Sequence, residues 1–136
     1  MTAYWGSFYE TGVQEIDLQH QEILARLNAV SSSSSAKQSR DMLIGLLAYL
    51  HQHFRLEEQF MPPDAEASKA HQQEHKRLAD IVGDLRDRVL TLQIPRIEQE
   101  CNDLIRDLLV EHTWRFDRPM AVSSLQARNA MAEASL

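Results

Sequence analysis

The chain has 136 residues, of which 43% are hydrophobic and 25% charged, which suits one globular domain with a buried core. Its formal net charge is −6 and its basic residues form no stripe, so the composition argues against a nucleic-acid partner. The longest uncharged apolar run, residues 42–50, is too short to cross a bilayer, and residues 1–12 lack the pattern of a signal peptide. We therefore expect no membrane insertion and a cytoplasmic location, with which the single cysteine, Cys101, is compatible.

Loop signals separate four segments with helical periodicity. The serine run at residues 31–35 and the pair Pro62–Pro63 interrupt helices, whereas Pro95 stands where a helix can begin. Apolar residues recur at steps of three and four within each segment, which predicts one inward face per helix. Because the connections are short, neighbouring helices should be antiparallel, and the expected fold is an all-α, up-and-down four-helix bundle.

The predicted inward faces contain nearly all of the histidines in the chain. In chain order, their members are Ile16, His20, Ile23, Leu27 and Val30; Leu43, Leu46, Leu50, His53, Glu57 and Met61; His71, His75, Leu78, Val82, Leu85 and Val89; and Ile97, Cys101, Leu104, Leu108 and His112. One histidine on such a face is usually a hydrogen-bonded core residue. Five, together with carboxylates, would cost several kcal/mol per unpaired group, whereas the whole domain is stable by only about 5–15 kcal/mol. Metal ions would satisfy all of these groups at once, so the sequence predicts a metal site inside the bundle.

The spacing of these residues also favours a metal. The pairs His53–Glu57 and His71–His75 each place two side chains one helical turn apart on one face, and His20 adds a single side chain from the first segment. The pair His112–Asp117 is separated by five residues, which a regular helix would rotate out of line. We therefore expect either a local π-type widening or a helix end near Asp117, which Pro119 would favour.

Four other residues with possible metal-binding side chains are expected not to be ligands. His51 lies about 200° around the helix from His53 and should face solvent. Glu58 should point away from the inward face, and Glu74 is either solvated or an outer partner of a histidine. Cys101 should serve only as core packing.

The string Gly12–His20, followed by the three spaced pairs described above, resembles the pattern of the hemerythrin family over about residues 5–117. The resemblance implies a non-haem di-iron centre in the core, with two iron ions (Fe²⁺/Fe³⁺), an oxo or hydroxo bridge and O₂ as the ligand. It implies the following ligands: His71, His75 and His112 for one iron, His20 and His53 for the other, and Glu57 and Asp117 as bridges. If each iron takes six ligands, one position stays open on the iron with two histidines.

The resemblance further implies an O₂ pocket beside the ligands, lined by Ile23, Phe54, Leu108 and Thr113. The family usually has tryptophan at the position of Leu108 and an aliphatic residue at that of Thr113. Both differences would open the pocket, and Thr113 adds a hydroxyl. We therefore predict that the oxygenated form oxidises faster than that of a storage hemerythrin.

The function implied by the resemblance is reversible dioxygen binding without enzymatic activity. Residues 1–119 would be the hemerythrin-like domain, and residues 120–136 an alanine-rich C-terminal helical tail. Such a tail can begin a linker to a covalently attached output domain, so we favour an oxygen- or redox-sensing domain of a bacterial signalling protein. The alternatives are a stand-alone oxygen storage or delivery protein and a di-iron protein that handles nitric oxide or peroxide. A ferritin-like oxidase would need Glu-x-x-His motifs, which these faces lack. Structural zinc would need only four ligands, whereas seven are present. A purely structural bundle is disfavoured by the number of histidines.

Overall fold

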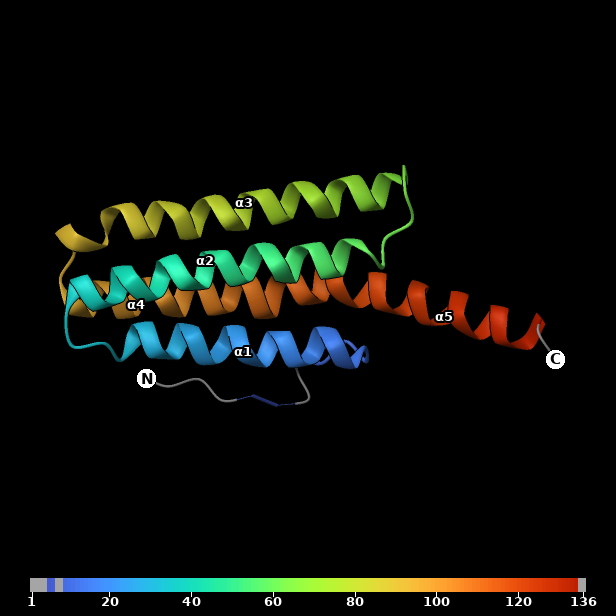
Figure 1. The fold of residues 1–136 in the computed structure, drawn as a ribbon, viewed down its shortest axis with the longest axis horizontal. Helices are drawn as coiled ribbons and strands as arrows, with labels where there is room; N and C mark the ends of the chain where they lie inside the picture. Colours follow the sequence, from blue (N-terminus) through green and yellow to red (C-terminus); the bar gives the residue numbers. More distant parts are fainter. Residues whose placement is uncertain (1–4, 7–8, 135–136) are drawn as a thin grey trace.

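A computed structural model describes residues 5–6 and 9–134 of the chain, and their arrangement is an all-helical four-helix bundle (Figure 1). The helices are α1 (Gln14–Ser31), α2 (Ala36–Glu58), α3 (Glu66–Arg88), η2 (Val89–Thr91), α4 (Ile94–Ile105), η3 (Arg106–Glu111), η4 (Thr113–Asp117) and α5 (Arg118–Ala134). Helix α1 packs against α2 and α4, and α2 packs against α3. Short connections reverse the chain at each end of the bundle, which confirms the predicted architecture. None of the described helices is long and apolar enough to cross a membrane.

Local hydrogen bonds set where the first two helices begin. The Asp17 carboxylate accepts from the backbone N–H groups of Thr11 (2.7 Å) and Gly12 (3.1 Å), which folds the preceding loop onto the first turn of α1. Gly12 has a φ of 92°, a left-handed conformation that glycine adopts at little cost. At α2, the Ser35 side chain accepts from the backbone N–H of Gln38 and forms an N-cap. These contacts fix the start of the two helices that carry His20 and His53.

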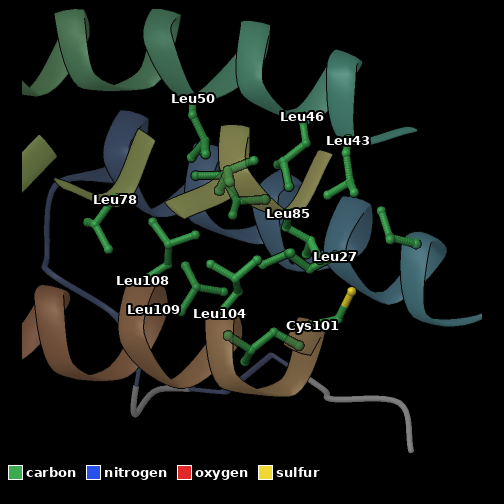
Figure 2. Packing of buried hydrophobic residues seen from close by; sticks show 14 of the residues in the cluster. Leu27, Leu43, Leu46, Leu50, Leu78, Leu85, Cys101, Leu104, Leu108 and Leu109 are labelled. Atoms are coloured by element: carbon green, nitrogen blue, oxygen red, sulfur yellow. The ribbon is translucent and has the colours of Figure 1, made fainter. Parts of the chain in front are cut away.

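The core consists of two apolar clusters on either side of a polar layer. All of the predicted inward positions are buried. Leucines from all four helices fill the larger cluster and point toward one another (Figure 2). The smaller cluster closes the opposite end; it contains Val13, Ile16, Met61, Met120 and Ala121. On α1, α2 and the fourth helix, the buried histidines and carboxylates fall between residues of these two clusters, so apolar side chains border the polar layer at both ends.

The fourth helix widens where the five-residue step occurs. The segments η3 and η4 are π-helical and flank His112, and η4 ends at Asp117. The helix then continues through Pro119 into α5, so the structure selects the widening and not a helix end. The N–H of Arg118 still donates to the carbonyl of Thr113, five residues back. Pro119, which has no N–H to donate, therefore lies where the backbone hydrogen bonds change from the π-helical to the α-helical pattern. At this point its missing N–H disturbs the helix little.

The apolar layer should account for much of the stability. Leu46 is fully buried, whereas Ile44 on the same helix is 45% exposed. We expect Leu46→Ala to lower the free energy of unfolding by about 2–5 kcal/mol and Ile44→Ala to change it by less than about 1 kcal/mol. Chemical denaturation of the two variants measures both values, and equal losses would contradict this account of the core.

Candidate metal centre

The seven residues predicted as metal ligands come together in the polar layer between the two apolar clusters. They are His20 on α1, His53 and Glu57 on α2, His71 and His75 on α3, His112 between η3 and η4, and Asp117 at the end of η4. Each of these seven residues is at most 3% exposed. Helices distant in sequence thus contribute to one dry site.

Asp117 contacts histidines on both sides of this site. Its Oδ1 lies 2.9 Å from Nε2 of His71 and 3.0 Å from Nε2 of His112. Its other oxygen, Oδ2, lies 3.2 Å from Nε2 of His20. One carboxylate therefore spans two groups of imidazoles, which is the arrangement that a bridging ligand requires.

Glu57 spans the same two groups from the opposite helix. Its Oε1 lies 2.9 Å from Nε2 of His75 and 3.4 Å from Nε2 of His53, and its Oε2 lies 3.7 Å from Nε2 of His20. Both carboxylates consequently have one oxygen close to the α3 histidines and one close to His20.

The donor atoms fall into two overlapping groups. In each group, one donor atom per residue lies within 4.8 Å of the others. The first group comprises Glu57, His71, His75, His112 and Asp117; the second comprises His20, His53, Glu57 and Asp117. This is the three-plus-two division of histidines, with shared carboxylates, that the resemblance implied. Ligation itself stays a prediction, but the geometry offers two adjacent cation positions.

Burial and the neighbouring carboxylates affect the site histidines differently. Burial alone would lower the pKa of His20, but the adjacent carboxylates of Asp117 and Glu57 outweigh it and raise that pKa to about 9. The same competition, with Asp117 as the main partner, raises the pKa of His112 to about 10. Burial prevails at His53 and lowers its pKa to about 4.

The two carboxylates stay ionised in the apolar interior. Burial favours their protonated forms, but the surrounding imidazoles lower the pKa of Glu57 and that of Asp117 below their usual range. Positive charge next to these groups is therefore required, either as protons on imidazoles or as bound cations.

Polar atoms without partners provide a test of whether the site fits metal ions. In the described part of the chain, five buried side-chain atoms lack a hydrogen-bond partner: His20 Nδ1, Glu57 Oε2, His112 Nδ1, Thr113 Oγ1 and Asp117 Oδ2. Native interiors rarely leave such atoms unpaired. Two of them are carboxylate oxygens that face His20, where a cation would satisfy them. The donor set thus fits a pair of cations.

Two outer contacts were not recognised from the sequence. His53 Nδ1 donates to Gln19 Oε1 at 2.8 Å, and Gln19 is only half-buried. The position of Gln19 directly before His20 was the sequence signal that could have indicated this contact. His75 Nδ1 lies 3.4 Å from Glu58 Oε2, so the expectation that Glu58 points away from the site was wrong. A surface pocket of about 390 Å³ on this side leaves Glu58 open to solvent.

Other expectations for neighbouring residues can be compared with the structure. His51 is exposed, as expected, and Cys101 is buried without a disulfide. Glu74 pairs with Arg77, which also bonds Asp107 at 2.7 Å and so links α3 to η3. Glu74 therefore neither partners a histidine nor is simply solvated.

The four residues assigned to an O₂ pocket are all buried. Phe54 stacks on the ring of His75, with centroids 4.0 Å apart and an angle of 9° between the ring planes. Ile23, Phe54 and Leu108 belong to the larger apolar cluster, at its border with the histidines. Thr113 follows His112 directly, and its hydroxyl lacks a partner. Whether these side chains surround a bound ligand stays a prediction.

Comparison with known proteins gave one finding. The family model described as "Hemerythrin HHE cation binding domain" matches residues 11–115. That range includes six of the seven clustered residues and ends two residues before Asp117. Neither the curated proteins nor the solved structures gave a significant match to the chain.

The raised pKa values predict an unusual pH dependence for the metal-free protein. His20 and His112 bind their protons more tightly in the folded chain than in the unfolded chain, and the resulting contribution to stability is fully present below about pH 6.5. This contribution is lost as pH rises toward 9–10. Thermal melts of metal-free protein should show a Tm that falls between pH 6.5 and 9. Protein with bound metal should lack this fall, because its ligands are already deprotonated.

A pair of variants separates this effect from general alkaline destabilisation. His112→Gln should reduce the slope of Tm against pH in the metal-free protein, whereas exposed His51→Gln should leave it unchanged. A metal-free Tm that rises with pH over this range would contradict the assignment of protons to these histidines.

Proposed function

Because the chain belongs to the hemerythrin HHE cation binding domain family, we propose that its buried cluster holds two iron ions and binds dioxygen reversibly. The observation that carries this proposal is the unequal division of imidazoles between two groups that share both carboxylates. If both ions have the same coordination number, the ion beside His20 and His53 has one protein ligand fewer. With six positions on each ion and a shared oxo or hydroxo bridge, only that ion would keep room for an external ligand.

The donor set supports iron in preference to zinc. Imidazole and carboxylate together suit iron, and a pair of six-coordinate ions uses all seven residues. Structural zinc would leave part of the set unused, because it prefers four ligands. When bound, iron would supply a coordination position for O₂ and the electrons that reversible binding requires.

The protein contributes orientation and exclusion of water. Gln19 accepts from His53 Nδ1, which directs the opposite nitrogen of that ring toward Glu57. Phe54 covers the ring of His75. The apolar clusters on both sides keep the centre dry, which would slow the proton entry that promotes irreversible oxidation. We therefore propose a binding function and not catalysis.

The proposed biological role is oxygen or redox sensing. One continuous helix carries His112 and Asp117 and then extends past the end of the bundle as α5 (Figure 1). A change at the centre that moves Asp117 would therefore act directly on the base of α5. A storage or delivery protein would have no need for such a connection. Hydrogen exchange along α5, compared with and without O₂, distinguishes the two roles, and unchanged exchange would favour storage.

The first prediction from this proposal concerns metal content and spectra. Protein purified with iron should contain about two irons per chain and, after anaerobic reduction, develop visible charge-transfer bands in air that disappear when O₂ is removed. His53→Ala should lose this response, whereas His51→Ala, two residues away and exposed, should retain it. Protein that takes up no iron, or zinc alone, would refute the proposal.

The second prediction concerns the lifetime of the oxygenated form. Leu108 is almost fully buried beside the site, and a larger side chain there would close the pocket more tightly. Leu108→Trp should therefore slow autoxidation several-fold, as followed by decay of the visible bands. An unchanged rate, with iron content intact, would show that Leu108 does not limit access.

A further inference from the structure

A pocket of about 270 Å³ lies at the end of the bundle where α3 begins and α5 leaves it (Figure 1). Its wall is mainly apolar: Met61 follows α2, Phe116 and Met120 come from η4 and α5, and small side chains such as Ala67 line the α3 side. Met61 and Met120 are buried members of the smaller apolar cluster, so part of the wall is continuous with the core. At roughly 30 Å³ per non-hydrogen atom, the share of a water molecule, the pocket has room for about nine such atoms.

Arg115 gives this pocket one cationic side. It is the single charged side chain among the described residues that line the pocket, and it is exposed. Its guanidinium lies 5.6 Å from the centre of the Phe116 ring, and no described carboxylate lies within ion-pair distance of it. A guanidinium can bind a carboxylate through two parallel hydrogen bonds. The pocket thus combines an apolar wall with a site for one negative charge.

His71 presents a second donor to the pocket. The residue is 3% exposed, and its Nε2 faces the metal centre, 2.9 Å from Asp117 Oδ1. Its Nδ1 has no hydrogen-bond partner among the described residues, and it is not one of the unpaired atoms sealed from solvent, as Nδ1 of His20 and Nδ1 of His112 are. Because His71 lines the pocket, this nitrogen can meet a partner there.

Two other histidines of the centre already have a partner for the same nitrogen. His53 Nδ1 donates to Gln19 Oε1 at 2.8 Å, and His75 Nδ1 lies 3.4 Å from Glu58 Oε2. A histidine that binds a metal through one nitrogen normally donates its other N–H to a carboxylate, a carbonyl or water. The described residues that line the pocket beside His71 include no aspartate or glutamate, so a bound molecule can supply the carboxylate.

We propose that this pocket binds a small carboxylic acid with an apolar body, whose carboxylate accepts hydrogen bonds from Arg115 and from Nδ1–H of His71. The apolar part of the molecule then lies against Phe116 and Met120. Binding itself does not depend on which metal the centre holds. Where the proposed di-iron function holds, the pocket is an effector site, because one molecule contacts a predicted iron ligand and the base of α5 together.

Hexanoate matches the size of the pocket and serves as the probe, with hexylammonium as its counterpart of opposite charge. Calorimetric titration of the protein as purified should give saturable hexanoate binding with a Kd of about 1 mM or tighter. Hexylammonium should bind at least about tenfold more weakly, although the net charge of −6 attracts cations. Absence of saturable hexanoate binding, or equal affinity for the two ions, would overturn the proposal.

Three variants locate the binding site. Arg115→Gln should weaken hexanoate binding about fivefold, as expected for a partly solvated ion pair. Arg106→Gln should leave Kd unchanged and is the matched control, because Arg106 is exposed on the same continuous helix but outside the pocket. Ala67→Phe should fill the pocket and abolish binding with little change in Tm, because Ala67 is exposed. An unchanged Kd in Arg115→Gln, an equal loss in Arg106→Gln or retained binding in Ala67→Phe would contradict the assignment.

The contact with His71 has its own readout. In protein with two irons, saturating hexanoate should shift the visible charge-transfer bands of the wild type but not those of Ala67→Phe, which excludes direct binding of hexanoate to iron. Hexanoate binding without such a shift would overturn the contact with His71. A protein that takes up no iron but still binds hexanoate through Arg115 would refute the proposed function and support the pocket.

Discussion

Two ionised carboxylates buried among five imidazoles are the constraint on which the rest of the structure depends. Glu57 and Asp117 are fully buried, and the loss of hydration would be prohibitive without adjacent positive charge. The charge can come only from the imidazoles or from cations held between them. All four helices contribute a side chain to this layer, so their relative positions along the bundle axis are fixed by it. The larger, leucine-rich cluster then supplies the bulk of the apolar burial without specifying that register.

The same constraint explains the irregular fourth helix. His112 and Asp117 must both face the centre although five residues separate them, and only a wider helix brings them into line. Thr113, the first residue of η4, is fully buried on this widened helix. Because α5 follows Asp117 without interruption, this carboxylate and the projecting helix belong to one continuous helical segment.

The two halves of the centre differ in more than the number of histidines. On the α3 side, the imidazoles have close carboxylate partners, aromatic cover from Phe54 and an outer contact to Glu58. On the α1 side, His53 has Gln19 as its outer partner, while the two carboxylate oxygens that face His20 have no hydrogen-bond partner among the described residues. The half with fewer imidazoles thus also contains the two unpaired carboxylate oxygens.

The sequence by itself determined the four helices, their inward faces and the seven clustered residues, because a period of 3.6 residues and polar groups on an apolar face are both visible along one chain. It left two explanations open for the step from His112 to Asp117 and misjudged Glu58. Those questions depend on distances between helices. The π-helical widening allows Asp117 to contact histidines on α1 and α3, and Glu58 contacts His75 on α3. The pairing of Gln19 with His53, the contact of each carboxylate with both histidine groups and the unpaired hydroxyl of Thr113 were likewise decided by the tertiary structure. They arise only when residues distant in sequence share one small, dry volume, where each donor must find an acceptor or remain without one.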